Sequence, residues 1–151
     1  MRVTFEFDAK SLGAFNNKCQ AAIRNVGRGT KKATTEACKE ILEMSLQQVP
    51  KDTWTLAMSA FYTVSRRTDT SVNTWQYEGI VGYGGNGDPT NPKSGERASD
   101  YMLTVHEDLS AFHKNGKAKF LEDPVREYGE TKFARTVFKH VGNVLTDMCI
   151  K

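Results

Sequence analysis

The sequence has few of the patterns by which enzymes and metal-binding proteins are recognised. Its 151 residues include three cysteines, Cys19, Cys38 and Cys149, and no two of them have the C-x-x-C spacing of zinc or redox motifs. No G-x-S-x-G turn surrounds a serine, and no G-K-[ST] follows a glycine-rich stretch, so neither a hydrolase elbow nor a P-loop is indicated. We therefore expect no catalytic residue and no cofactor, and we expect the cysteines to be small buried side chains in a reducing compartment.

Long hydrophobic runs and a strong charge of one sign are missing as well. No apolar stretch approaches the roughly 20 residues that a membrane-spanning helix needs, and the first ten residues show neither a signal-peptide core nor a targeting pattern. The net charge of +3 is mild and does not by itself indicate a nucleic-acid-binding protein. With 38% hydrophobic residues the chain is too apolar for disorder, and its length predicts a single domain over residues 1–151, assembled in the cytoplasm.

The spacing of apolar residues in the first third of the chain predicts two helices. The first would begin at Ser11 as N-cap and run to about Val26, where Gly27-Arg28-Gly29 would end it. Thr30 would cap the second helix, which would end near Gln48 because a proline follows two residues later.

Alternating side chains predict a small sheet. Val3, Phe5 and Phe7 alternate with polar residues, as in a half-buried strand. Residues 57–65 and 74–83 are rich in aromatic and β-branched residues, and the polar residues 66–73 between them favour a two-stranded antiparallel hairpin. With the N-terminal strand the sheet would have three or four strands.

The rest of the chain predicts a long loop and a long C-terminal helix. Residues 84–99 are rich in glycine and proline, and they would form either a disordered excursion or an arm that becomes ordered against a neighbouring subunit. Asp123 would cap a helix with Pro124 in its first turn, extending to about Met148 and packing on the second helix. The fold class is therefore α+β, with a small antiparallel sheet packed by two or three helices.

Three groups of residues suggest chemistry, and each also has a structural explanation. His106, Glu107, Asp108 and His113 offer metal ligands, but their spacing does not bring them onto one helix face, so we expect no metal site. Basic residues predominate between Lys10 and Lys39, which fits a solvated helix face better than a DNA-facing surface. Aromatic residues in the strand segments could stack on bases, but core or interface packing is the commoner role of such positions. These residues are Tyr62, Trp75, Tyr77 and Tyr83.

Two segments carry a recognisable pattern. The first is V-P-K-D-T at residues 49–53. The second begins with a tyrosine-led segment ending in His-Glu and continues through a polar loop to G-K-A-K-F-L-E, within residues 101–122. In order and spacing, the two segments together resemble a signature of the small neck and tail-completion proteins of tailed bacteriophages. The matching positions are Pro50, Asp52, Thr53, Tyr101, His106, Glu107, Gly116, Ala118, Lys119, Phe120, Leu121 and Glu122.

The resemblance implies a non-enzymatic virion protein of the head–tail connector or minor capsid kind. Such a protein would form a homo-oligomeric ring of six or twelve copies at the phage neck. Its partners would be head-side connector or portal proteins, tail terminator or tail tube proteins, and genomic DNA that passes through the lumen without being read; no membrane partner is implied. A nucleic-acid-binding accessory protein, using the basic helices and the strand aromatics, is the alternative.

Two positions depart from the family pattern. Trp54 stands where the family usually has glycine, so we expect an altered turn and a later start of the following strand. Met102 stands where a small alanine is common, which predicts altered packing beneath Tyr101.

Overall fold

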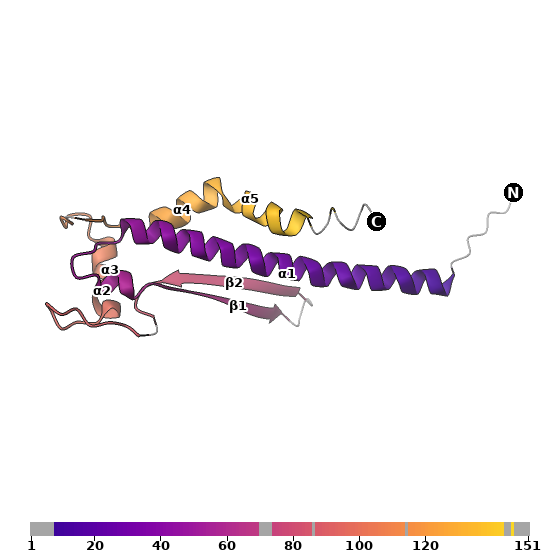
Figure 1. The fold of residues 1–151 in the computed structure, drawn as a ribbon, viewed down its shortest axis with the longest axis horizontal. Helices are drawn as coiled ribbons and strands as arrows, with labels where there is room; N and C mark the ends of the chain where they lie inside the picture. The colour runs from indigo at the N-terminus through magenta and orange to yellow at the C-terminus, as the bar shows by residue number, and fades with distance from the viewer. Residues whose placement is uncertain (1–7, 70–73, 86, 114, 144–145, 147–151) are drawn as a thin grey trace.

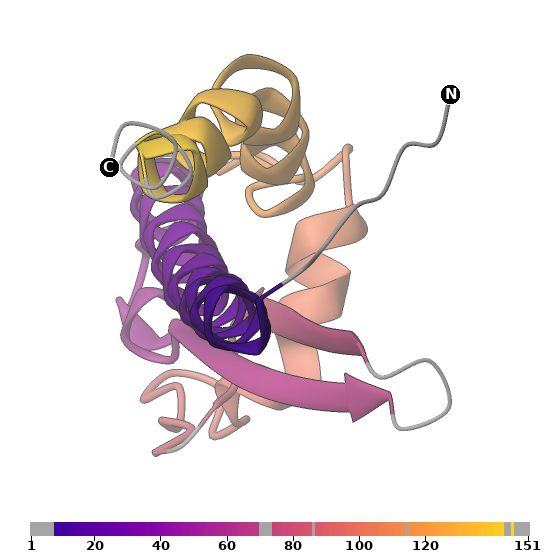
Figure 2. The same cartoon turned by 90° about the vertical axis from the view of Figure 1, so that its right-hand side faces the viewer.

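The computed structural model describes residues 8–69, 74–85, 87–113, 115–143 and 146 (Figure 1). In this part of the chain, a long helix lies between a two-stranded antiparallel sheet and a row of short C-terminal helices, so the expected α+β class is confirmed. Figure 2, which looks along the long helix, shows the hairpin on one side of it and the C-terminal helices on the other. The elements are α1 (Ala9–Gln48), α2 (Thr55–Met58), β1 (Phe61–Asp69), β2 (Thr74–Gly82), α3 (Ala98–Glu107), α4 (Glu122–Thr131), α5 (Phe133–Val137) and the π-helical turn η1 (Phe138–Gly142).

Helix α1 is one continuous helix of 40 residues, about 60 Å long at 1.5 Å per residue. The predicted break at Gly27-Arg28-Gly29 was therefore wrong. A Cβ atom on Gly29 would collide with the backbone carbonyl of His140, so this glycine allows the C-terminal segment to approach α1 closely. That contact offsets the loss of about 1 kcal/mol that a glycine costs inside a helix.

Asp8 caps the N-terminus of α1. The predicted cap, Ser11, was therefore wrong. The Asp8 carboxylate accepts hydrogen bonds from the backbone N–H groups of Lys10 and Ser11, at 3.2 and 3.1 Å. These bonds favour the ionised carboxyl and lower its pKa, with the Lys10 N–H contributing most. The predicted strand at Val3–Phe7 lies outside the described residues.

The hairpin is confirmed, but its first strand lies later in the chain than predicted. Strand β1 begins at Phe61, because residues 55–58 form the helical turn α2 instead of continuing the strand. The pairing joins Phe61 to Gly82 and Asp69 to Thr74, so β1 also takes in residues that we had assigned to the connecting loop. Gly79 lies on the face that packs on α1, where a Cβ would collide with Sγ of Cys38.

Residues 84–85 and 87–97 belong to a loop that is held by its own hydrogen bonds. The Asn91 N–H donates to the Glu96 carbonyl at 2.7 Å, and the Ala98 N–H donates to the Pro89 carbonyl at 3.0 Å. The predicted loop thus ends two residues early, because Ala98 and Ser99 belong to the first turn of α3. Ordering of this loop against a neighbouring subunit stays a prediction.

The C-terminal segment is not the single long helix that we predicted. It begins at Glu122 with Leu121 as N-cap, two residues before the expected cap Asp123, and it bends at Lys132 (φ −120°, ψ −29°). The bend lets α4 and α5 both follow α1, as Figure 1 shows. It also brings the Tyr128 hydroxyl to 2.7 Å from Oγ1 of Thr136 inside the fold. Packing against the second predicted helix, now the C-terminal half of α1, is confirmed.

The buried core lies toward the C-terminal end of α1. Five buried side chains from separate parts of the chain meet there: Val49, Leu56, Tyr83, Ala98 and Phe120. Met102 is half-buried against this cluster beside Tyr101, where we expected altered packing. The core therefore ties the end of α1 to α2, α3 and the segment before α4.

Candidate functional site

The two segments of the sequence pattern meet at the end of α1. The Lys117 N–H donates to the Gln48 carbonyl at 2.9 Å, and the Lys51 N–H donates to the Asn115 carbonyl at 3.4 Å. Residues 48–51 and 115–117 thus run side by side. We call this meeting point, with the part of α3 that contacts residues 119–122, the junction.

Gly116 is required where the two segments touch. Its φ of +105° is a conformation that side chains rarely adopt, and a Cβ there would lie 2.6 Å from the backbone nitrogen of Pro50. Only glycine permits both the turn and the close approach. Pro50 and Gly116, far apart in the sequence, are therefore in direct backbone contact.

His106 fastens the end of α3 to the segment before α4. Its carbonyl accepts a hydrogen bond from the Lys119 N–H at 2.8 Å, and its ring Nε2 accepts one from the Glu122 N–H at 3.3 Å. With Nε2 acting as acceptor, Nδ1 carries the proton that it donates to Oε1 of Glu107, 2.8 Å away. The imidazole is thereby held on both nitrogens, and its interactions at the junction are structural.

Charged side chains surround this histidine. Lys119 forms ion pairs with Glu107 and, at 2.9 Å, with Glu122. The hydrogen bond from Lys119, followed by that from His106, lowers the pKa of Glu107, and the bonds to Glu107 and Glu122 raise the pKa of Lys119. Glu107 and Glu122 are exposed to solvent and Lys119 is half-buried, so these pairs add orientation more than stability.

Phe120 is the apolar centre of the junction, with 1% of its surface exposed. Its ring packs edge to face against Tyr83, with centroids 5.1 Å apart, and against His106, with centroids 5.0 Å apart. The Tyr83 hydroxyl is 2.7 Å from Oγ of Ser45 in α1, and burial raises the pKa of Tyr83 to about 12. Phe120 therefore connects α3, the end of the sheet and α1, with Leu121 and Ala118 half-buried beside it.

A small hollow of about 210 Å³ opens beside the junction. Burial raises the pKa of Tyr101 in its wall, and hydrogen bonds with Thr55, Asn91 and Thr53 oppose that rise. Asp52 at its rim pairs with Lys93 of the 84–97 loop at 2.7 Å. The lining residues are Pro50, Asp52, Thr53, Leu56, Asn91, Tyr101, Val105 and His113.

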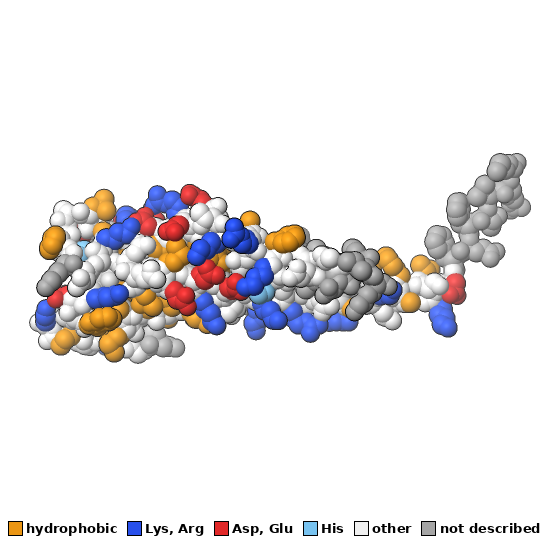
Figure 3. All heavy atoms as spheres, turned by 45° about the horizontal axis from the view of Figure 1, so that its top comes forward, with side chains coloured by type: hydrophobic (Ala, Val, Ile, Leu, Met, Phe, Trp, Pro, Cys, Tyr) orange, Lys and Arg blue, Asp and Glu red, His pale blue; other side chains and the backbone are white. Residues whose placement is uncertain are grey.

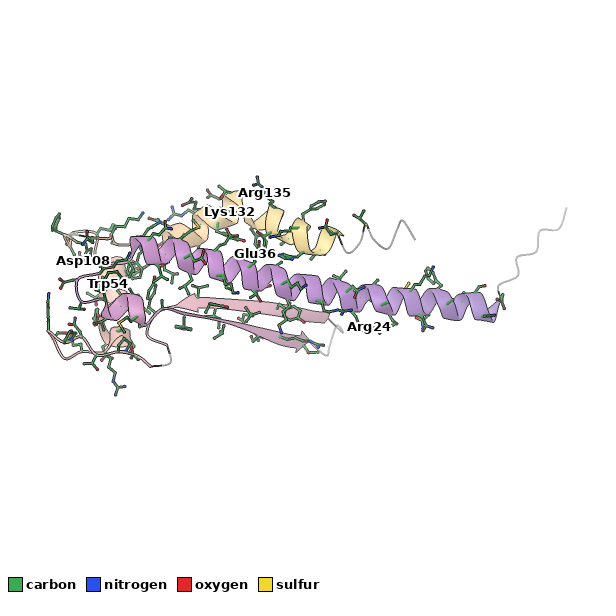
Figure 4. The ribbon with its side chains drawn as sticks, viewed as in Figure 1. Arg24, Glu36, Trp54, Asp108, Lys132 and Arg135 are labelled. Atoms are coloured by element: carbon green, nitrogen blue, oxygen red, sulfur yellow. The ribbon has the colours of Figure 1, made fainter. Side chains whose placement is uncertain are left out.

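Trp54, the first departure from the family pattern, adopts a left-handed backbone (φ 62°, ψ −8°). A glycine would take this conformation without strain, whereas a bulky side chain does so rarely. The strand that follows starts at Phe61, as the substitution led us to expect. Figure 4 shows Trp54 at the same end of the molecule as Asp108, which follows α3.

Of the four aromatic residues in the strand segments, Tyr62 is 36% exposed, whereas Tyr77 and Tyr83 are turned toward the rest of the fold. Tyr83 is buried in the core. Tyr77 lies two residues from Gly79 in β2 and so shares with it the face that packs on α1. The Trp75 side chain lies outside the described residues. This arrangement favours core packing for Tyr77 and Tyr83.

Within the described residues, no three His, Cys, Asp or Glu side chains gather closely enough to hold a metal ion. None of the described helices is long and apolar enough to cross a membrane. Sequence reasoning missed Ser45, Gln48 and Asn115, which complete the junction. Their types carry no signal in the sequence, because an ordinary backbone carbonyl or hydroxyl acquires its partner only in the folded chain.

Comparison with known protein families, with curated proteins and with solved structures found no match. No family is therefore assigned to the chain on similarity, and the resemblance carried by residues 49–53 and 101–122 stays a prediction.

Proposed function

We propose that this chain is a structural virion protein of the neck of a tailed bacteriophage. In this proposal it forms a ring with copies of itself between the head-side connector or portal and the tail, and the ring lines the passage for genomic DNA. It has no catalytic role. The fold alone does not imply this function, so the argument depends on the junction.

One observation carries the proposal: the two short segments behind the phage-neck resemblance form a single packed unit. Pro50 touches Gly116, and residues 48–51 hydrogen-bond to residues 115–117. Phe120 and His106, both matched positions, pack on each other within the same unit. Two short matches that pack against each other in the fold support the resemblance more strongly than two matches that lie apart.

The chemistry of the junction also supports a structural role. Both nitrogens of His106 are engaged in hydrogen bonds, and the neighbouring Glu107 is paired with Lys119. None of these groups stands beside a serine or cysteine nucleophile within the described residues. The groups instead fix the position of backbone segments.

Exposed apolar side chains at this end of the molecule suggest a protein partner. Leu109 and Phe112, in the loop after α3, are 77% and 92% exposed. Trp54 and Met58, which follow residues 49–53 closely in the sequence, are exposed as well. Large apolar side chains in solvent commonly mark sites of protein contact. A neck protein has such partners on the head side and on the tail side.

The test is made on virus particles. An antibody raised against the purified chain should label virions at the head–tail junction in electron micrographs. Loss of the gene should give filled heads and separate tails, and purified chain added to that mixture should restore joined particles. Intact infectious particles without the chain would overturn the proposal.

A variant pair sharpens this test. Phe112→Glu changes a side chain that contacts almost nothing in its own subunit, so the variant should fold normally yet restore fewer joined particles. Thr68→Glu is the matched control, because it adds the same single negative charge at an exposed position near the end of β1, away from this loop. Full restoration by Phe112→Glu would remove this loop from the partner surface.

A further inference from the structure

The N-terminal part of α1 projects beyond the rest of the described fold. In Figure 1 it extends past the ends of both the hairpin and the C-terminal helices. Every residue from 10 to 18 is exposed. We call residues 9–24 the arm, and the remainder of the described fold the body.

The arm has an apolar face that no other described part of the chain covers. Leu12, Phe15, Cys19 and Ile23 follow one another at spacings of three and four residues, which places them on one side of a helix. Leu12, Phe15 and Ile23 are 52%, 67% and 50% exposed. An isolated helix is marginal in water, and helices in proteins are stabilised mainly by packing of such a face.

The same face is covered where α1 enters the body. Continuing the helical spacing from Ile23 leads to Val26, which is half-buried, and then to Ala33 and Ala37, which are buried. The apolar stripe thus runs the length of α1, and the body covers only its C-terminal part. Within the described residues, nothing covers the apolar face of the arm.

The first 27 residues of α1, residues 9–35, carry charge of one sign only. Residues 9–35 contain six lysines and arginines and no acidic residue, so the rest of the chain has a net charge of −3, given +3 for the whole. None of the six forms an ion pair with a carboxylate of the described residues, whereas many cations of the body are paired. Figure 3 shows blue side chains along the flank of α1. The six residues are Lys10, Lys18, Arg24, Arg28, Lys31 and Lys32.

We propose that the arm of one copy packs, through Leu12, Phe15, Cys19 and Ile23, against the body of a second copy. This inference rests on the proposed ring and specifies its contact. Pairing of arm with arm would bring two sets of three unpaired cations together, Lys10, Lys18 and Arg24 of each copy. Arm on body can instead place these cations against residues 36–151, whose 14 lysines and arginines and 16 aspartates and glutamates give a net charge of −2. A contact between two different surfaces is head-to-tail, and such contacts form a ring when the rotation between subunits closes, while a symmetric arm–arm contact stops at a dimer.

The first experiment measures the mass of the purified full chain by sedimentation velocity. Wild-type chain should self-associate, and Phe15→Glu should shift it to monomer by at least tenfold in dissociation constant. Asn17→Glu is the matched control: it adds the same charge to the same exposed part of α1, but on the side opposite Phe15, and should lower affinity far less. Both variants should melt like a wild-type monomer, because neither side chain is buried within its own subunit.

The second experiment separates head-to-tail contact from arm–arm pairing. A Phe15→Glu copy has a defective arm but an intact body, so it should still bind the arm of a wild-type copy. Mixed with wild type, it should therefore end growing assemblies and convert large assemblies into small mixed ones. Arm–arm pairing predicts that the variant stays out of wild-type complexes, and that result would overturn the proposal. A wild-type chain that remains monomeric at millimolar concentration would overturn it too, whether its arm then binds duplex DNA or lipid vesicles instead.

These outcomes are independent of the test on virions. Label at the phage neck combined with a Phe15→Glu ring of normal mass would reject the arm contact and leave the proposed function standing. Arm-dependent rings of a chain that is missing from particles would do the reverse.

Discussion

Gly116 and Pro50 are in backbone contact, with the position of a Cβ on Gly116 only 2.6 Å from the Pro50 nitrogen. The contact joins the segment that follows α1 to the segment that precedes α4, and the hydrogen bond from Lys117 to Gln48 lies directly beside it. Residues 48–51 and 115–117 therefore hold each other in place. A single substitution in either segment should change the free energy of unfolding.

Gly116→Ala should lower the free energy of unfolding by at least about 2 kcal/mol, because the new Cβ adds a steric collision to an unfavourable backbone conformation. Denaturant titration followed by circular dichroism measures the loss. Gly95→Ala is the control: Gly95 has φ +77°, but nothing lies within 4 Å of its Cβ position, so only the backbone cost of about 1 kcal/mol should appear. Equal losses for the two variants would show that the contact with Pro50 contributes nothing.

Phe120→Ala should cost about 3–5 kcal/mol, the usual range for truncating a buried phenylalanine. That is a large part of the roughly 5–15 kcal/mol that stabilises a typical domain, so little folded subunit should remain at elevated temperature. Phe112→Ala removes the same atoms from a side chain that is 92% exposed and should change stability by less than about 0.5 kcal/mol. Thermal melts of both proteins test this, and similar melting temperatures would contradict the place of Phe120 in the core.

Trp54→Gly should be more stable than Trp54→Ala by about 1 kcal/mol. Both changes remove the ring and its contact with the Lys51 ammonium, which lies 5.5 Å from the ring centroid. Only alanine retains a Cβ in the left-handed conformation, which costs about 1–2 kcal/mol. Glycine also loses more backbone entropy on folding than alanine does, which offsets part of this strain, so the denaturation midpoints of the two variants measure the net preference for glycine at this position.

Stability should fall as the pH rises above 10, in part because of Tyr83. Burial raises its folded pKa to about 12 from an ordinary value of 10, so above pH 10 the unfolded chain releases this proton while the folded chain retains it. The folded state then binds more protons than the unfolded state, and the contribution, about 3 kcal/mol, is lost as the pH passes from 10 to 12. Unfolding titrations at pH 9 and pH 11 should show a smaller drop for Tyr83→Phe. The same drop in both proteins would mean that Tyr83 ionises freely in the fold.

Some elements could be predicted from the sequence because their signals are local. Aromatic and β-branched residues on either side of a polar turn determined the hairpin, and the spacing of Ala33, Ala37 and Ile41 determined the helix before Pro50. The α+β class follows from these elements alone. Local signals failed at Gly29, where the His140 backbone packs closely against α1 and the helix continues through the predicted break.

The tertiary structure alone decided how the candidate site is assembled. The sequence marked Pro50, His106, Gly116 and Phe120 as separate members of two short segments, with no indication that they touch. Their contacts depend on the direction in which α1 and α3 leave the core, which is set by many weak packing interactions and not by any one residue. The uncovered face of the arm is likewise invisible in the sequence, because the same apolar spacing continues into the buried half of α1, and only the reach of the body determines where the cover ends.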